Sequence, residues 1–368
     1  MIFFPIIVII VLILSHYFIY WNLVNIFSVS PKYKIILIFI LFLFASSFII
    51  SSIISHFYNN IFTRIFYYLS SSWLWIVSNL FFAFIFLALL IFVLKFFHIN
   101  YNHKIIWSIF IFFSILAFIY WVYNANNPVL KNVEIKINNL PKSWENKKII
   151  MFSDLHLWAI VRENFLKKII SMINKENPDI VFIPWDFFDW TDWNLEHLKE
   201  EINNIKVKDW IYYVFWNHET YLWREKSKKL ISWTKIKLLN NEFIDIDWVQ
   251  IVWIDYFEWF SSKQNLNQVF SDLKKTWFDK TKPSILLFHT PTLTEEFKNF
   301  WINLHLAWHT HKWQFWPYSY ITNLVYSWKD HWLYTNWNYN LYTSIWIWTW
   351  WPQVRIWNSP EIVVLKLK

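Results

Sequence analysis

The chain has 368 residues, of which 56% are hydrophobic and 16% are charged, and it contains no cysteine and no glycine. The missing cysteine excludes a disulfide-stabilised scaffold, thiolate metal ligands and a cysteine nucleophile, and the apolar content excludes a disordered chain. Thirty residues are tryptophan, close to the share that glycine normally occupies.

The charges are divided unevenly along the chain, whose formal net charge is +8. Residues 1–123 contain no acidic residue, and the first acidic residue is Glu134. Because short basic loops orient membrane helices, this excess of positive charge is typical of a membrane protein, and we expect no nucleic-acid partner. The basic residues of this first third are Lys32, Lys34, Arg64, Lys95 and Lys104.

Four stretches of the first third are long and apolar enough to cross a bilayer, which requires about 20 apolar residues. No charge lies in the middle of any of them, so the alternative of buried helices in a soluble protein fits poorly. We predict a membrane domain of four transmembrane α-helices over residues 1–123, in a multi-pass protein of the cell membrane. The predicted spans cover approximately residues 2–20, 35–54, 74–97 and 105–123.

The basic loops also predict an orientation. The loops after the first and third spans carry Lys32, Lys34, Lys95 and Lys104, whereas the loop after the second carries only Arg64. Because basic loops stay in the cytoplasm, we expect the C-terminal part of the chain to be extracytoplasmic. A transporter with a soluble appendage is a further alternative, but no acidic residue or arginine lies within a span to line its pathway.

From about residue 129 the pattern changes to short apolar runs that alternate with charged, amphipathic stretches, and residues 124–128 form the joint. This alternation is typical of an α/β domain in which helices cover sheets, and we predict such a domain over residues 124–368. Helical spacing of apolar residues predicts helices over residues 162–174, 195–205 and 266–277. Strands are predicted over residues 148–152, 180–183, 211–215, 250–254, 285–288 and 302–306.

Side chains that bind metals follow five of the predicted strands. Loops at the carboxyl ends of strands in open α/β sheets form the binding crevice, so we expect these side chains to converge. Taken singly, each is usually a turn, cap or core residue, and five in succession point to a common site. In chain order they are Asp154 and His156, Asp186, Asn217 and His218, His289, and His309 and His311.

Carboxylate, imidazole and amide ligands together suit divalent ions such as Mn²⁺, Fe²⁺, Zn²⁺ or Co²⁺. The candidate ligands exceed what one ion requires, and a shared carboxylate can hold two ions close together. Such a pair stabilises both the attacking and the leaving oxygen of an in-line displacement at phosphorus. The sequence therefore predicts two divalent metal ions and a phosphate-ester substrate.

This order and spacing resembles the calcineurin-like metallophosphoesterases, whose pattern is Asp-x-His, Gly-Asp, Gly-Asn-His-Glu/Asp, a later His, and Gly-His-x-His. The tail that ends in Pro360-Glu361 is similar to the membrane-associated bacterial branch of the YkuE and YaeI types. The resemblance covers about residues 130–368 and implies a four-layer αββα sandwich for the C-terminal domain. The matching residues are Asp154-Leu-His156, Trp185-Asp186, Trp216-Asn217-His218-Glu219, His289 and Trp308-His309-Thr310-His311.

The resemblance implies a role for each residue. Asp186 bridges the two metals, and His218 stabilises the phosphoryl group or protonates the leaving oxygen, so these two are the catalytic residues. His305 alternates with strand residues, and we predict that it is a packed core histidine. The first metal is bound by Asp154, His156, Asp186 and His311, and the second by Asp186, Asn217, His289 and His309.

The chain departs from the family pattern in one consistent way: tryptophan stands where the family has glycine, as at Trp185, Trp216 and Trp308. The turn before each ligand needs a residue without a Cβ, either to reach a positive φ or to let the backbone approach metal and phosphate. We interpret these tryptophans as the product of an opal codon that the organism reads as glycine. The alternative is a natural tryptophan-rich protein, whose indoles would crowd the pocket.

The sequence thus predicts a membrane-anchored, dinuclear metal-dependent phosphoesterase that hydrolyses a phosphate ester or pyrophosphate bond by metal-activated hydroxide. The membrane location points to a lipid-linked or cell-envelope substrate, and the lipid bilayer is the other expected partner. The alternative is a non-catalytic membrane scaffold or binding protein that retains the fold. The sequence contains no signal for an oligomeric state.

Overall fold

The computed structural model describes most of the chain, which divides into two compact units. The first unit contains the helices as far as Val122, and the second runs from Tyr123 through the last strand. The described residues are 3–58, 60–153, 155, 163–184, 198–214, 228–229, 231–239, 243–254, 271, 278–312, 314, 319–349, 354–356 and 358–368.

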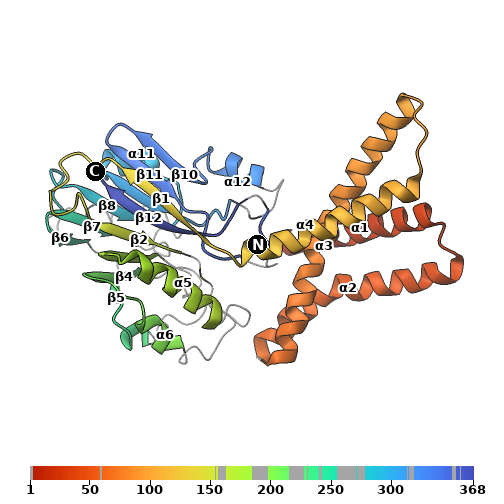
Figure 1. Cartoon of the computed structure of the whole chain (residues 1–368), viewed down its shortest axis with the longest axis horizontal. Helices are drawn as coiled ribbons and strands as arrows, with labels where there is room; N and C mark the ends of the chain where they lie inside the picture. The colour runs from red at the N-terminus through yellow and green to blue at the C-terminus, as the bar shows by residue number, and fades with distance from the viewer. Residues whose placement is uncertain are drawn as a thin grey trace. The chain divides into compact units, whose positions relative to one another are not determined.

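Four apolar helices form the first unit, as the sequence predicts (Figure 1). Within the described residues, all four are long and apolar enough to cross a membrane. Large apolar side chains such as Ile35 and Phe42 are mostly exposed, which in a bilayer means contact with lipid tails. The protein is therefore a membrane protein. The helices are α1 (Phe3–Phe27), α2 (Pro31–Phe57), α3 (Ile61–Phe96) and α4 (His103–Ala125).

Helix α3 begins at Ile61, well before the span predicted from residue 74. Asn60 caps the helix, because its side-chain oxygen accepts hydrogen bonds from the backbone N–H groups of Phe62 and Thr63. Arg64 and the serines that follow lower the hydropathy of the first turns without ending the helix. The 36 residues of α3 extend about 54 Å at about 1.5 Å per residue, which exceeds a hydrocarbon core of about 30 Å.

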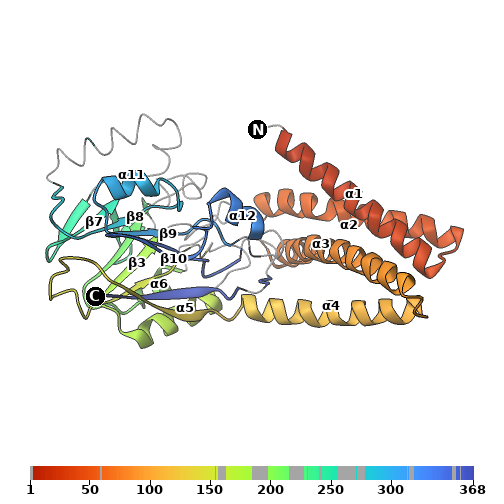
Figure 2. The ribbon, with the colours of Figure 1, turned by 90° about the horizontal axis from the view of Figure 1, so that it is seen from above.

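Two six-stranded mixed sheets form the second unit (Figures 1 and 2). The first has the order β1-β12-β2-β3-β4-β5, in which β2 to β5 are parallel and β12 pairs with β1 in parallel and with β2 antiparallel. Its strands are β1 (Val129–Ile135), β12 (Glu361–Leu367), β2 (Lys148–Met151), β3 (Ile180–Pro184), β4 (Trp210–Val214) and β5 (Lys237–Leu239).

The second sheet has the order β10-β11-β9-β8-β7-β6. Its four central strands are parallel, and each edge strand pairs antiparallel with its neighbour. Its strands are β10 (Trp332–Asn336), β11 (Tyr339–Thr343), β9 (Leu304–Ala307), β8 (Ser284–Leu287), β7 (Val249–Trp253) and β6 (Phe243–Ile246).

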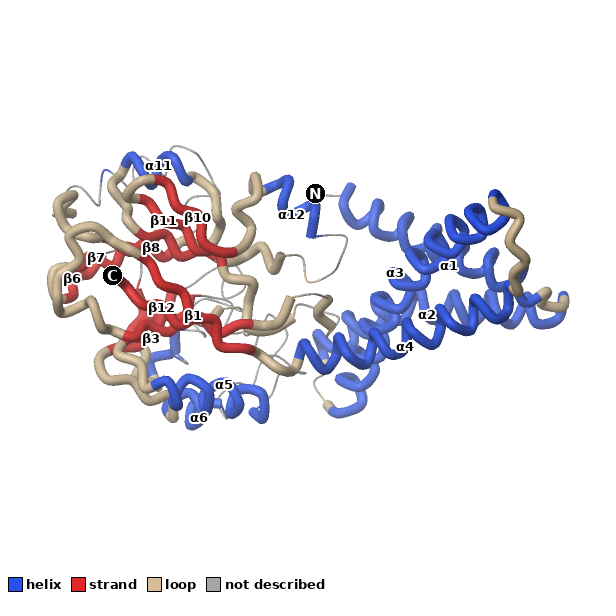
Figure 3. Tube along the Cα trace, turned by 45° about the horizontal axis from the view of Figure 1, so that its top comes forward, coloured by secondary structure: helices blue, strands red, loops and turns tan. Residues whose placement is uncertain are grey.

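Alternate residues of each strand face opposite sides of its sheet, with the period of two expected for strands. In β2, Ile149 and Met151 belong to an apolar core that both sheets share, whereas Ile150 packs on the other face with residues of α5. In β7, Ile251 faces the shared core and Val252 packs in a cluster that includes α11. Figure 3 shows the helices beside the sheets. The described helices are α5 (Glu163–Glu176), α6 (Lys199–Asn203), α11 (Thr294–Asn299) and α12 (Ser319–Val325).

All six strands predicted from the sequence are confirmed, as β2, β3, β4, β7, β8 and β9. The helix predicted over residues 162–174 is α5, whose buried face consists of Leu166, Ile169, Ile170 and Ile173. The helix predicted over residues 195–205 is found as the shorter α6, with residues 195–197 outside the described residues. The helix predicted over residues 266–277 lies outside them apart from residue 271. The other strands were not predicted.

Candidate metal centre

Three of the seven predicted metal ligands lie among the described residues, namely His289, His309 and His311. The strands that precede the other four ligands, β2, β3 and β4, are parallel neighbours, so their carboxyl ends share one edge of the first sheet. Outside the described residues lie Asp154, His156, Asp186 and Asn217, together with the predicted catalytic residue His218.

His289 and His309 converge at the carboxyl ends of two adjacent strands. β8 ends at Leu287 and β9 at Ala307, and the two strands pair in parallel, so the segments that follow leave the same edge of the sheet. Nε2 of His289 lies 2.5 Å from Nδ1 of His309, and the ring centres are 4.2 Å apart. At this distance the two imidazoles share a hydrogen bond, and to bind one common ion the two nitrogens would have to separate to about 3.3 Å, the spacing of two nitrogen ligands at about 2.0–2.1 Å from a tetrahedral ion.

The loop that carries His309 and His311 has a left-handed backbone. The φ angle is 69° at His309, 54° at His311 and 45° at Lys312, a region that costs about 1–3 kcal/mol per non-glycine residue and recurs at functional sites. The buried Thr310 anchors the loop, because its hydroxyl donates a hydrogen bond to the backbone carbonyl of Asp330. Sequence reasoning did not single out Asp330, since an isolated aspartate in a turn carries no distinguishing signal.

His311 and Trp346 compete for the same space, which two complete rings cannot share. Trp346 is buried and has a φ of 81°. A positive φ favours a residue without a Cβ, such as glycine, at position 346. An indole at this position also obstructs the imidazole of His311, which the resemblance assigns to the first metal. Trp308, which we expected to crowd the pocket, is instead packed in the core shared by the two sheets, edge-on to His289.

The end of β2 reaches the same place from the first sheet. The backbone N–H of Ile347 donates to the carbonyl of Ser153 at 3.3 Å. Ser153 directly precedes Asp154 in the sequence, and Ile347 directly follows Trp346. The segment that contacts His311 therefore joins a strand end of the first sheet to the ligand loop of the second.

A buried carboxylate fixes this joining segment, residues 344–347. The side chain of Glu361 accepts hydrogen bonds from the hydroxyls of Tyr342 and Ser344, both at 3.0 Å, and from the N–H of Ile345 at 3.2 Å. The buried guanidinium of Arg355 donates to the carbonyl of Ile345. Burial raises the pKa of Glu361, while the hydrogen bonds and the nearby Arg355 oppose that rise.

His305 is a core histidine, as the sequence predicts, and it is fully buried on β9. Its Nε2 faces the carbonyl of Phe288 at 3.2 Å and its Nδ1 faces the hydroxyl of Tyr339 at 2.7 Å. Because a carbonyl only accepts, Nε2 carries the proton and Nδ1 accepts from Tyr339. Burial lowers the pKa of His305 to about 3, against the opposing hydrogen bond to Phe288. The imidazole is therefore neutral.

Among the described residues, no group of three or more histidine, aspartate or glutamate side chains could hold a metal. Four of the seven predicted ligands lie outside those residues. The donors that are described fit a divalent transition metal, because imidazole nitrogen is a common ligand of zinc, iron and manganese in mixed sites.

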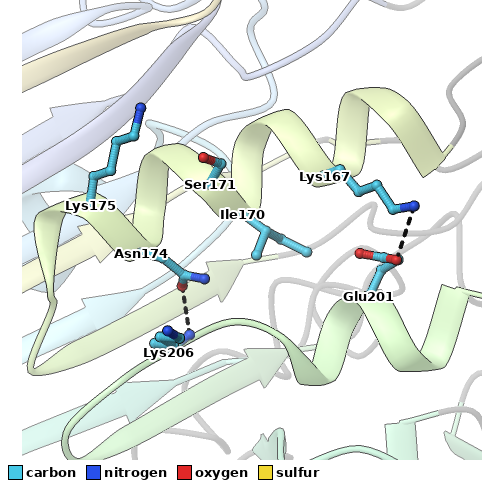
Figure 4. Close-up of a pocket in the computed structure, with 7 residues that line it drawn as sticks. All are labelled: Lys167, Ile170, Ser171, Asn174, Lys175, Glu201 and Lys206. Carbon is cyan, nitrogen blue, oxygen red and sulfur yellow. Dashed lines mark hydrogen bonds and ion pairs between the residues drawn. The ribbon is translucent and has the colours of Figure 1, made fainter.

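Two hollows formed by described residues contain none of the predicted ligands. One, of about 360 Å³, includes Asn303 and Tyr339 at the amino ends of β9 and β11, the edge of the sheet opposite to the histidine pair. The other, of about 390 Å³, lies beside α5 (Figure 4). Its lining includes an ion pair between Lys167 and Glu201 at 3.3 Å. It is lined by Lys167, Ile170, Ser171, Asn174, Lys175, Glu201 and Lys206.

Comparison with known proteins gives several similar sequences, although no protein-family model matches the chain. An uncharacterized metallophosphoesterase of Campylobacter jejuni is 30% identical over 248 residues, which are 66% of this chain and 63% of that protein. An uncharacterized metallophosphoesterase of Helicobacter pylori is 28% identical over 54% of this chain and 52% of its own length. A transmembrane protein with metallophosphoesterase domain of Danio rerio is 28% identical over 58% of this chain and 51% of its own length.

The chain thus spans between about half and just under two thirds of the length of these relatives. Among solved structures, the protein TT1561 of Thermus thermophilus matches with a TM-score of 0.31 and 11% identity, over 44% of this chain and 81% of that one, which is too low to bear on the fold. Relatives named metallophosphoesterase in both bacteria and animals, some of them transmembrane, support the metallophosphoesterase family for this membrane protein.

Proposed function

We propose that the protein is a membrane-anchored, dinuclear metal-dependent phosphoesterase that hydrolyses a phosphate ester or pyrophosphate bond. The observation that carries this proposal is the convergence of His289 and His309 at the carboxyl ends of two parallel strands. The hydrogen bond between Ile347 and Ser153 supports it, because it draws the sequence next to Asp154 toward His311. The names of the relatives agree with this chemistry.

In the proposed site, His289, His309 and Asn217 would hold one ion, and His311, Asp154 and His156 would hold the other. Asp186 would contribute its carboxylate to both. Bound divalent ions supply positive charge at the phosphoryl group and a nucleophile from water at neutral pH. His218 holds a proton at the leaving oxygen, the role of a general acid.

The finer features of fold and location are part of the same proposal. We infer a four-layer αββα sandwich, supported by the core that both sheets share and by the separate apolar clusters on their outer faces. The C-terminal tail that ends in Pro360-Glu361 supports assignment of the chain to the YkuE/YaeI-like branch. The basic loops of the membrane unit support an extracytoplasmic domain. A lipid-linked or cell-envelope phosphate is the proposed substrate, because the chain resides in the membrane.

We infer further that many of the tryptophans are glycines in the natural protein, introduced by reading an opal codon as tryptophan. The support comes from backbone conformation. β6 and β7 are joined by the two residues Asp247 and Trp248, whose φ angles are 47° and 76°. Two positive φ angles define a type I′ hairpin turn, for which Asp-Gly is a preferred sequence. Of the sixteen described residues with positive φ, six are tryptophans, Trp248, Trp301, Trp328, Trp332, Trp337 and Trp346.

Peptide mass spectrometry of the protein from its native cells tests the recoding. A glycine mass at positions 248 and 346 is the expected result. An indole mass at both positions would overturn the inference. In that case an indole at position 346 leaves no room for the imidazole of His311, which favours the second candidate function, a non-catalytic membrane scaffold that retains the fold.

The enzyme proposal is tested with the full chain in detergent micelles, produced with glycine at positions 185, 216, 308 and 346. Hydrolysis of bis-p-nitrophenyl phosphate and p-nitrophenyl phosphate is measured with Mn²⁺. We expect turnover that falls by about 100-fold or more in His218→Ala, the range of a general acid, and in Asp186→Asn. His309→Ala should weaken Mn²⁺ binding in calorimetry.

The matched control is Glu145→Gln, because Glu145 is an exposed carboxylate in the turn before β2. It should leave both turnover and Mn²⁺ affinity unchanged. Absence of turnover with every divalent metal, in a chain that still binds Mn²⁺, would replace the enzyme by the scaffold.

A further inference from the structure

One face of α12 carries large apolar side chains that the fold leaves exposed. Leu324 and Val325 are 73% and 66% exposed, and Tyr320 and Ile321 are 54% and 44% exposed. In an ordinary surface helix, side chains of this kind form the stripe that packs on the core. These four residues, which we call the α12 face, point away from it.

The inward side of the helix is polar. Thr322 and Asn323 are buried, and so is Asp330, the carboxylate that they contact. The hydroxyl of Thr322 donates to Asp330 at 2.8 Å, the amide of Asn323 donates to both carboxylate oxygens at 2.6 and 2.8 Å, and Nδ1 of His331 lies 2.7 Å from the same carboxylate. Removing these hydrogen-bond donors from a buried carboxylate would cost free energy, because the charge would be left buried and unpaired. The helix therefore cannot turn its apolar face inward, and the exposure is built into the fold.

The connection to the membrane unit keeps the second unit at the bilayer surface. Residues 126–128 alone separate the end of α4 at Ala125 from the start of β1 at Val129, and three residues span at most about 10 Å. Asn124 is held firmly within the second unit, because its amide donates to the carbonyls of Arg355 and Asn358, both at 3.1 Å. The short connection limits how far the second unit can move from a bilayer crossed by α4.

The charge around the α12 face suits anionic headgroups. Between Glu296 and Glu361 the sequence contains one acidic residue, the buried Asp330. Lys329 lies four residues after Val325, with its ammonium group 4.9 Å from the ring of Tyr334. Aliphatic and aromatic side chains bordered by lysine are found in helices that lie in the membrane interface.

We propose that the α12 face is a bilayer-binding surface, inserted at the level of the lipid headgroups. None of the four residues of the α12 face is a tryptophan, so the proposal holds whether or not position 328 is glycine. The surface adjoins the candidate site, because the ring of Tyr326 stands edge-on to His309, with ring centres 6.4 Å apart. Insertion would thus present the His309 side of the site to phosphate carried on lipid. The test below does not use activity, so its failure would leave the phosphoesterase proposal standing.

The chain contains no cysteine, which allows a single label to be placed cleanly. Leu324→Cys is labelled with bimane in the full chain and reconstituted in nanodiscs of phosphatidylcholine and phosphatidylglycerol. Quenching is measured with lipids brominated on their acyl chains and with aqueous iodide. Ile115→Cys on α4 is the control for a lipid-facing site, and Ser171→Cys on α5 the control for an exposed polar surface.

We expect the label at position 324 to be quenched by brominated lipid to at least about half the extent seen at position 115, since interfacial helices lie about 5–10 Å into the headgroup boundary. The label at 171 should be quenched by iodide alone. A label at 324 that behaves like the one at 171 would overturn the proposal. A label shielded from both quenchers would also overturn it, because protein would then cover the face. Ile321→Cys repeats the test if Leu324→Cys fails to fold.

Discussion

His305 on β9 and His289 after β8 are both fully buried, but their ring nitrogens have different hydrogen-bond partners. Those of His305 face Tyr339 and Phe288, which fixes a neutral imidazole, whereas Nε2 of His289 faces His309. Position in the sequence predicted this difference, because His305 alternates within a strand and His289 follows one. The proximity of position 346 to His311 could not be predicted, since it brings together segments that are distant in the sequence.

We expect His305 to make the protein less stable as the pH falls below 6.5, its pKa before burial. The folded-state pKa of about 3 is lower, so between these values the unfolded chain binds the extra proton and stability rises with pH. At about pH 5 this difference amounts to about 2 kcal/mol. His305→Gln keeps a donor and an acceptor but does not titrate, and it should flatten the dependence of Tm on pH.

The measurement is thermal unfolding of the full chain in detergent across this pH range. His98→Gln, at an exposed position after α3, is the control and should keep the wild-type slope. An unchanged slope in His305→Gln would show that His305 is not the group responsible.

At the scale of elements, strands that end in polar side chains were predictable, and strands that depend on distant partners were not. β1 has no regular alternation of apolar and polar residues, because Lys131 and Asn132 interrupt it, and it is a strand because it pairs with β12 over seven residues. The hairpin of β10 and β11 turns at residues 337 and 338, and Trp337 has a φ of 56°. With glycine at 337 the turn would have been evident in the sequence, and tryptophan there conceals it.

The segment of residues 344–347 is the element on which the candidate site depends most, and Glu361 holds it. Tyr342, Ser344 and Ile345 all donate to the same oxygen, Oε1, so Glu361→Gln keeps an acceptor for them but removes the negative charge that strengthens these hydrogen bonds. We expect a loss of about 1–3 kcal/mol in the free energy of unfolding. Mn²⁺ affinity should fall by about 10–100-fold, as for residues that orient metal ligands.

Calorimetric titration with Mn²⁺ checks this prediction, beside a measurement of Tm. Glu134→Gln is the matched control, since Glu134 is an exposed carboxylate paired with Lys368. It should leave Mn²⁺ affinity unchanged. A lower Tm with unaltered affinity in Glu361→Gln would restrict Glu361 to a purely structural role.

At the scale of the whole molecule, the sequence predicted a membrane part and an α/β part because acidic residues begin only at Glu134. It also predicted strands ahead of His289 and His309, and β8 and β9 are found there. The link between the two sheets through Ser153 and Ile347 was not predictable, because backbone hydrogen bonds between irregular segments leave no pattern in the residues.

Metal binding should stabilise the whole chain. A ligand that binds only the folded state at about 100 times its Kd adds about 2.7 kcal/mol, so Mn²⁺ should raise Tm by several degrees and EDTA should reverse the rise. The rise should be lost in His309→Ala and kept in Glu145→Gln. An equal rise in His309→Ala would place the stabilising ion elsewhere.

The pairing of β1 with β12 sets an order on biosynthesis. β12 lies between β1 and β2 and pairs with both, yet it is synthesised long after them. The delay is measured by Asn124, just before β1, and Arg355, just before β12, which are 231 residues apart in the sequence. At about 5–20 residues per second, translation leaves β1 without its neighbour for roughly ten to fifty seconds. A nascent strand with open edges invites aggregation. The charges of Lys131 and Glu134 on β1 discourage such pairing during this interval, and the first sheet closes only after β12 has been synthesised.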